Sequence, residues 1–237
     1  MSGSRAHAAP GRAGWNRLRY TLYAPLYDLF LARFPVFSRG RRRAIALAAL
    51  QPGERVLLVA AGTGLDLPLL PEGVEVTAVD ITPAMLERLR ARARRLGRPV
   101  RAEVMDAARL DLPDASFDCV VLHLALAVVP DPTAAAREAA RVLRPGGRVS
   151  LFDKFLPRGR RPSVVRRFLS AVADVLASDL NREVEPLLEA AGLRLTALES
   201  VGFAGNFVAG RAEKPDLPPG APPRRTAASI SNPESQP

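Results

Sequence analysis

The residues best suited to bind a ligand form one glycine loop and two strand-end carboxylates. The apolar run 55–60 leads into the loop 60–64, Ala-Ala-Gly-Thr-Gly, and later apolar runs end near Asp80 and Asp106. Glycines let a loop turn tightly and bring its backbone amides close to a ligand. Because ligands of parallel α/β sheets lie beyond the carboxyl ends of the strands, these features together predict a site for a nucleotide-type cofactor.

Asp80 lies 18 residues after Gly62, where a carboxylate can accept hydrogen bonds from ribose hydroxyls, and Asp106 with Ala107 can hold the edge of an adenine. The dinucleotide fingerprint Gly-x-Gly-x-x-Gly does not fit, because its third position is Leu67 when counted from Gly62. Counting from position 60 also places a leucine there. The loop therefore favours S-adenosylmethionine over NAD.

Apolar runs of strand length alternate with segments of helical period, which predicts a parallel sheet with helices on both faces. Thr82 followed by Pro83 predicts the start of one helix, and Pro-Gly-Gly at 145–147 predicts the end of another. The apolar runs 193–199 and 203–209 lie too close together for a crossover helix, so they predict an antiparallel hairpin. The other expected strands are 55–60, 74–79, 100–105, 117–122 and 147–152, and the expected helices are 83–96, 133–143, 163–177 and 182–191.

Composition divides the chain into four segments. Residues 1–14 are small and basic, which predicts a flexible N-terminus, and 15–50 predict a helical cap of two helices. Residues 51–212 hold the alternating pattern and are the expected cofactor-binding core. Residues 213–237 contain seven prolines and almost no large apolar side chains after Leu217, which predicts a disordered tail.

The stretch 56–155 resembles the class I S-adenosylmethionine-dependent methyltransferase family. The similar features are the loop 60–64, Asp80, Asp106-Ala107, the strand that begins Phe117-Asp118, and the turn Leu143-Arg-Pro-Gly-Gly147. The resemblance implies a seven-stranded, Rossmann-like α/β sandwich with a mostly parallel sheet and a C-terminal antiparallel hairpin. It also implies that S-adenosylmethionine is held by Ala60, Ala61, Gly62, Thr63, Gly64, Asp66, Asp80, Ile81, Asp106, Ala107 and His123.

Within that family, the segments 19–28, 62–66 and 152–155 are similar to bacterial phosphatidylethanolamine N-methyltransferase-like proteins. This narrower resemblance implies methyl transfer to a small or lipid-like acceptor, such as a phospholipid amine. Two alternatives stay open: a quinone or other small-molecule C-methyltransferase, and a cofactor-binding relative without turnover. No nucleic-acid partner is expected, because the chain has no appended RNA-binding module and no Asn/Asp-Pro-Pro-aromatic motif. The oligomeric state is left open.

Two positions depart from the family pattern. Leu58 stands where the family has an acidic residue, and Ala60 replaces the first loop glycine, so weakened cofactor binding is expected. His123 ends the fourth strand and is the candidate catalytic base, the alternative being a hydrogen-bonded strand-end residue. Methyl transfer needs little acid–base help, because a sulfonium carries an excellent leaving group and alignment supplies most of the rate.

Other candidate residues lie outside the loop. Tyr20, Tyr23 and Tyr27 share one helix face, which predicts a lid over the cofactor, a cation-binding surface for the ammonium headgroup of a substrate, or core packing. Lys154 is a candidate substrate contact, or half of an exposed ion pair with Asp153. No group of side chains predicts a metal site.

The net charge of +10 arises because residues 51–140 and 172–237 carry −3 each, while 1–50 and 141–171 carry +8 each. Such segments, with Arg-rich runs at 39–43 and 158–161, suit peripheral contact with an anionic membrane; a compositional bias is the alternative, since 32 of 34 basic residues are Arg. No apolar stretch is long enough to cross a membrane, and no signal-peptide core is present. With the single Cys119, these features predict a cytoplasmic protein.

Overall fold

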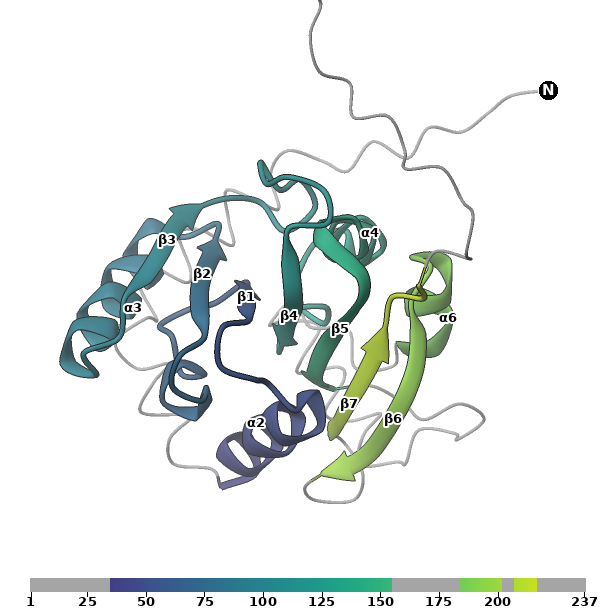
Figure 1. Cartoon of the computed structure of the whole chain (residues 1–237), viewed down its shortest axis with the longest axis horizontal. Helices are drawn as coiled ribbons and strands as arrows, with labels where there is room; N and C mark the ends of the chain where they lie inside the picture. The colour runs from purple at the N-terminus through teal and green to yellow at the C-terminus, as the bar shows by residue number, and fades with distance from the viewer. Residues whose placement is uncertain (1–34, 155–183, 202–206, 217–237) are drawn as a thin grey trace, which may run out of the picture.

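A seven-stranded sheet in the order β3-β2-β1-β4-β5-β7-β6 forms the centre of the computed structural model, which describes residues 35–154, 184–201 and 207–216 (Figure 1). The strands are β1 (Arg55–Val59), β2 (Glu75–Asp80), β3 (Val100–Val104), β4 (Phe117–His123), β5 (Leu143–Asp153), β6 (Arg194–Val201) and β7 (Phe207–Glu213). Strands β1 to β5 pair in parallel, and β7 runs antiparallel between β5 and β6. The predicted fold, including its terminal hairpin, is confirmed.

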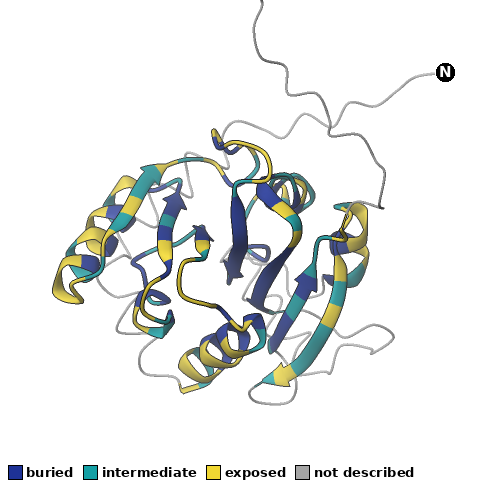
Figure 2. Ribbon diagram, in the orientation of Figure 1, coloured by how far each residue is buried: buried dark blue, intermediate teal, exposed yellow. Residues whose placement is uncertain are grey.

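Helices cover both faces of the sheet. They are α2 (Pro35–Ala48), α3 (Pro83–Arg95), α4 (Pro132–Val142) and α6 (Val184–Ala190), with a short 3-10 turn, η1, at Leu67–Leu69. Side chains of β1 alternate between the faces: Val56 and Leu58 join a cluster with α2 and α3, whereas Leu57 and Val59 join one with α4 and α6. Figure 2 shows the buried central strands between more exposed helices. No helix of the described residues is long and apolar enough to span a membrane.

Local sequence signals set the helix starts. Proline occupies the first turn of both α3 and α4, where its missing N–H costs no intrahelical bond. Asp131 caps α4, since its side chain accepts a hydrogen bond of 2.9 Å from the amide of Ala134. Thr82 lies at the predicted N-cap of α3, but its hydroxyl makes no cap bond and instead bonds to Asp80.

The ends of two strands differ from the sequence prediction. Strand β5 begins at Leu143 rather than at 147, because Leu143 still pairs with Phe117 before the register shifts at the Pro-Gly-Gly segment. Strand β7 begins at Phe207 and runs to Glu213, one residue into the range 213–237 assigned to the tail. Glycine suits position 210 of this strand, because an added Cβ there would lie only 2.8 Å from the Ala197 carbonyl oxygen. The predicted helix 163–177 and the residues 203–206 lie outside the described residues.

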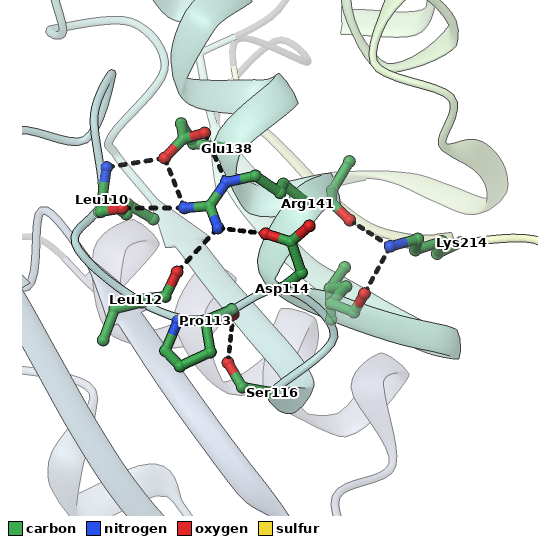
Figure 3. Close-up of polar contacts among 10 residues, drawn as sticks. Leu110, Leu112, Pro113, Asp114, Ser116, Glu138, Arg141 and Lys214 are labelled. Carbon is green, nitrogen blue, oxygen red and sulfur yellow. Dashed lines mark hydrogen bonds and ion pairs between the residues drawn. The ribbon is translucent and has the colours of Figure 1, made fainter. Parts of the chain in front are cut away.

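Arg141, at the end of α4, fixes the loop that leads into β4 (Figure 3). Its Nε and Nη2 each donate at 2.8 Å to Glu138, and Nη1 donates at 2.6 Å to Asp114. The same guanidinium donates to the carbonyl oxygens of Leu110 and Leu112 at 2.8 and 2.7 Å. All three guanidinium nitrogens of Arg141 therefore make hydrogen bonds within the fold, and these bonds fix the loop that precedes β4.

Candidate active site

A cleft lies beyond the carboxyl ends of the parallel strands, and it encloses about 910 Å³ including the part open to solvent. Nine of the eleven residues expected to contact the cofactor line it: Ala60, Ala61, Gly62, Thr63, Asp80, Ile81, Asp106, Ala107 and His123. The other two, Gly64 and Asp66, lie behind this lining. The remaining lining residues are Arg41, Leu65, Thr82, Met85, Met105, Leu124, Val128, Val129 and Pro130.

The loop after β1 is joined to the end of β2 by Asp80. One carboxylate oxygen accepts a hydrogen bond of 2.8 Å from the Gly62 amide, and the other accepts one of 2.8 Å from the Thr82 amide. Burial raises the pKa of Asp80, and the amides together with the Thr82 hydroxyl only partly offset this. Gly62 has a φ of +54° and nothing within 4 Å of an added Cβ, so its open side faces the cleft.

Gly64 has a packing role instead. With a φ of +77°, it lies where an added Cβ would meet Leu89 at 2.9 Å and Leu67 at 3.0 Å. Thr63 beside it is buried, and its carbonyl oxygen accepts a hydrogen bond of 2.7 Å from Arg92 of α3. The second half of the loop is thus fixed against α3, which leaves the first half to face the cleft.

Asp66 forms the centre of a buried polar chain that runs from α2 to β5. It accepts hydrogen bonds from Arg41 Nη1 at 2.5 Å and from His123 Nδ1 at 2.7 Å. His123 Nε2 lies 3.0 Å from the hydroxyl of Ser150. Burial raises the pKa of Asp66, but Arg41 and His123 outweigh that effect and hold the pKa well below its usual range.

Both ring nitrogens of His123 are therefore engaged. Nδ1 bonds to the Asp66 carboxylate, and Nε2 is within hydrogen-bonding distance of the Ser150 hydroxyl. The side chain is 1% exposed, and its ring also lies edge-on to Phe152. In this arrangement no ring nitrogen is open to a substrate, so a role as catalytic base stays a prediction. The geometry matches the alternative of a hydrogen-bonded strand-end residue.

The remaining candidates are dispersed. Asp106 is exposed at the cleft, and its side chain accepts a hydrogen bond of 2.9 Å from the Ala108 amide. Lys154 follows β5 and does not line the cleft; burial lowers the pKa of its ammonium, and Asp153 only partly offsets this. The candidates Tyr20, Tyr23 and Tyr27 lie outside the described residues.

The Arg-rich run 39–43 is not the uniform surface that the sequence suggested. Arg41 is 7% exposed and bonds to Asp66, two residues after the loop 60–64, so its side chain is not part of an exposed arginine surface. Arg43 is exposed and pairs with Glu199 of β6. Helical spacing carried a signal for Arg41, because it shares a face with the buried Ile45 and Ala48, four and seven positions later.

One wall of the cleft is apolar and was not predicted. Leu124, Val128, Val129 and Pro130 come from the segment between β4 and α4. Leu124 has a φ of +55°, in the left-handed region that disfavours a residue with a large side chain, and its amide donates to the carbonyl oxygen of Phe152 at 2.6 Å. Strained residues that persist at a cleft point to a site whose shape matters.

Comparison with known proteins identifies related sequences. A family described as a methyltransferase domain matches residues 57–151. The chain is 42% identical over 132 residues to a phosphatidylethanolamine N-methyltransferase of Cereibacter sphaeroides, covering 55% of this chain and 64% of the relative. It is 39% identical over 136 residues to a demethylmenaquinone methyltransferase of Thermus thermophilus, covering 55% and 61%. The matched stretch thus spans less than two thirds of either relative.

Solved structures share the fold at low sequence identity. The cyclase SpnF superposes with a TM-score of 0.71 at 19% identity, covering 91% of this chain and all of that one. A methyltransferase dependent on S-adenosylmethionine from Aquifex aeolicus gives 0.55 at 20% identity, covering 73% of this chain and 89% of that one. Because a cyclase shares it, the fold alone does not specify the reaction. The sequence matches, however, relate residues 57–151 to the family described as a methyltransferase domain and to relatives named as methyltransferases.

Proposed function

We propose that the protein transfers a methyl group from S-adenosylmethionine to a lipid-like acceptor. The observation that carries the proposal is the cleft itself, in which the Gly62–Asp80 hydrogen bond and the apolar wall of Leu124 and Val128 share one space. The polar side suits a nucleoside, and the apolar side suits a hydrocarbon-rich acceptor. Related proteins that act on phosphatidylethanolamine and on demethylmenaquinone support the same reading.

The residues at the polar side fit the cofactor. Asp80 retains acceptor capacity for a ribose hydroxyl, and a second hydroxyl can bind when the Thr82 hydroxyl turns away. Asp106 and the backbone of Ala107 border the place for an adenine edge. When bound, S-adenosylmethionine supplies an activated methyl group on sulfur. The task of these side chains is to hold the nucleoside so that the methyl group points toward the apolar wall.

The first acceptor candidate is the amine of phosphatidylethanolamine, and the second is a ring carbon of a demethylated quinone. Both join a reacting atom to a long hydrocarbon, which fits the wall formed by Leu124, Val128, Val129 and Pro130. The relatives at 42% and 39% identity are named for these two classes of acceptor. The first is preferred because segments 19–28, 62–66 and 152–155 are similar to the phospholipid enzymes.

A methyl-transfer assay separates these candidates. The full chain is incubated with methyl-labelled S-adenosylmethionine and phosphatidylcholine vesicles that contain phosphatidylethanolamine, demethylmenaquinone or neither, and the extracted lipids are counted. Label in the amine lipid supports the first candidate, and label only in the quinone selects the second. Binding of S-adenosylhomocysteine by calorimetry without label in either lipid identifies a cofactor-binding protein that does not methylate them.

A lipid acceptor requires the protein to reach a membrane, and exposed arginines of α2 suit that contact. Arg39 and Arg42 are exposed, whereas the buried Arg41 is unsuited to it. Replacing Arg39 and Arg42 by Gln removes two exposed positive charges and should reduce co-sedimentation with phosphatidylglycerol vesicles at low salt. Co-sedimentation of the wild type should fall as salt is raised, because screening shortens the reach of surface charge to about 8 Å near physiological salt. Equal sedimentation of the wild type with neutral and anionic vesicles would remove the membrane role.

A further inference from the structure

The apolar wall of the cleft is a turn of the chain that is neither helix nor strand. It occupies residues 124–130, between the end of β4 and the residue that caps α4. Leu124 and Val128 of this turn line the cleft, whereas Leu126 is fully buried in the apolar core. Because such a turn has no regular ladder of hydrogen bonds, each of its buried amides needs an acceptor from elsewhere.

Two consecutive residues at the end of β5 supply those acceptors. The carbonyl oxygen of Phe152 accepts a hydrogen bond of 2.6 Å from the Leu124 amide. The Asp153 carboxylate accepts one of 3.0 Å at Oδ2 from the Ala127 amide. The amide of Leu126 also donates to this carboxylate. The end of β5 therefore holds the turn at three of its amides.

A carboxylate is a costly group to place at position 153. Asp153 is 0% exposed and shares a sheet face with Leu151, which belongs to the apolar core. Burial raises the pKa of Asp153, and the amides bonded to it only partly offset this. An apolar side chain would avoid the cost of burying a charge, but it would leave the amides of Leu126 and Ala127 unbonded. The contribution of the carboxylate is therefore the placement of the turn.

The opposite side of the cleft is held by a different carboxylate. Asp80, at the end of β2, accepts from the amides of Gly62 and Thr82. Strands β1 and β4 lie between β2 and β5 in the sheet, so Asp80 and Asp153 are separate supports. A change at Asp153 is therefore expected to displace the apolar wall and to leave the polar side in place.

We propose that Asp153 is a positioning residue for the acceptor of methyl transfer. Its bonds to two amides of the turn fix the position at which Leu124 and Val128 face the cleft. Asp153 is fully buried, so it acts on the acceptor through these side chains. The inference rests on the proposed function, in which the apolar wall holds the hydrocarbon of a lipid-like acceptor. A displaced wall would weaken acceptor binding, because a site depends on the residues that support its lining.

The test compares two substitutions of buried aspartates in the full-length protein. In Asp153→Asn an NH2 group replaces one of the two acceptor oxygens. Since Oδ2 binds the Ala127 amide and Oδ1 binds the Lys154 amide, one of these amides loses its partner. Asp118→Asn is the matched control, because Asp118 is 7% exposed and accepts the Arg55 amide at 2.6 Å near the opposite end of the strands.

Acceptor binding and cofactor binding are measured separately. Methyl transfer is followed in phosphatidylcholine vesicles that contain phosphatidylethanolamine or demethylmenaquinone, whichever the wild type methylates. In Asp153→Asn the acceptor fraction that gives half the maximal rate should rise about fivefold or more, while affinity for S-adenosylhomocysteine stays within a factor of two by calorimetry. Amides 124–130 should exchange with deuterium about tenfold faster, as measured by mass spectrometry. Asp118→Asn should change none of these, because a loss of stability alone lowers the maximal rate and not the half-saturating acceptor fraction.

A second variant guards against misfolding. Asp153→Ser removes the buried charge and is measured in parallel, with circular dichroism to check folding. An unchanged half-saturating acceptor fraction in a folded Asp153 variant would overturn the inference, and so would an equal loss of affinity for acceptor and S-adenosylhomocysteine. A wild type that labels neither lipid would instead remove the proposed function, and with it the acceptor role of Asp153.

Discussion

Arginines at the two ends of the parallel strands differ in how fully their nitrogens are used. Near the amino ends, Arg148 of β5 donates from Nη1 and Nη2 to Glu54 at 2.9 and 2.6 Å, and from Nε and Nη2 to the carbonyl oxygens of Ala48 and Ala49 at the end of α2. At the carboxyl ends, Arg41 makes one hydrogen bond, to Asp66, and its Nε has no partner in the described part of the chain.

The difference distinguishes arginines whose guanidinium nitrogens are all bonded within the fold from one with an unbonded nitrogen, in a chain where nearly every basic residue is Arg. Charge and burial do not separate them, because Arg41 and Arg148 are each 7% exposed. The number of guanidinium nitrogens that make hydrogen bonds does separate them. Arg148 and Arg141 join segments far apart in sequence with all three guanidinium nitrogens bonded, whereas the buried Nε of Arg41 has no partner in the described residues.

The largest expected effect comes from the saturated end. Arg148→Gln leaves Glu54 and the last carbonyl groups of α2 without their partner, so the free energy of unfolding should fall by about 3 kcal/mol in urea denaturation. The affinity of the folded variant for S-adenosylhomocysteine should stay within a factor of two. Arg144→Gln is the control, because the Arg144 side chain is half exposed and Asp118 keeps its hydrogen bond from the Arg55 amide, so the change should cost less than about 1 kcal/mol.

The contrast drawn between Arg148 and Arg41 is contradicted if Arg148→Gln weakens ligand binding as strongly as a substitution of Arg41. That outcome would mean that the two ends of the strands are coupled through α2, which contains Arg41 and whose last carbonyl oxygen accepts from Arg148. An unchanged stability would instead show that the carbonyl groups of Ala48 and Ala49 are satisfied by water.

At the site end, Asp80 should govern affinity. Asp80→Ala removes the acceptor of the Gly62 and Thr82 amides and the partner expected for the ribose, so affinity for S-adenosylhomocysteine should fall at least tenfold, or about 1.4 kcal/mol, by calorimetry. Unfolding in urea should change far less than in Arg148→Gln. Wild-type affinity in the variant would place the ribose elsewhere.

The pH dependence of ligand affinity tests the role of the Asp80 carboxylate independently. Burial raises the pKa of Asp80, so its proton returns at a higher pH than for an ordinary aspartate. A protonated carboxyl accepts hydroxyl donors poorly, so ligand affinity should fall as pH is lowered, beginning above the range near 3.9 where aspartates usually titrate. Asp80→Asn should show a flatter profile, and an identical decline in that variant would assign the titration to another group.

The sequence was sufficient for the sheet and for most of the cleft lining because those signals are local. The apolar run before Gly62, the carboxylate at Asp80 and the proline at Pro83 each report on neighbours within a few residues. Their meeting at one edge then follows from the parallel pairing of β1, β2 and β3. The terminal hairpin followed from the short spacing between its two apolar runs.

Long-range pairing explains what was missed. Arg41 and Asp66 are 25 positions apart and His123 a further 57 from Asp66, so nothing local distinguishes Arg41 from its exposed neighbours except the helical spacing of buried residues. Strand β7 was placed too early because Gly210 and Arg211 read as poor strand residues. Close approach of Ala197 in β6 makes glycine suitable there.

The smallest expected effect concerns the loop backbone. Ala60 has a φ of +51°, a conformation that costs a residue with a Cβ about 1–2 kcal/mol, and the family pattern has glycine at this position. Glycine avoids that cost but adds about 0.4–1 kcal/mol of flexibility to the unfolded chain. Ala60→Gly should therefore raise the free energy of unfolding by up to about 1 kcal/mol, seen as a rise in Tm of about 2–4 °C by calorimetry.

Ala61 provides the matched control, because it lines the same cleft but does not have a positive φ. Ala61→Gly gains no relief of strain, so it should lose stability by about the flexibility cost alone, and the two variants should move Tm in opposite directions. A fall in Tm for both would show that Ala60 adopts its conformation without strain. The family's glycine would then serve the approach of the cofactor rather than the turn, and Ala60→Gly should tighten the binding of S-adenosylhomocysteine without stabilising the fold.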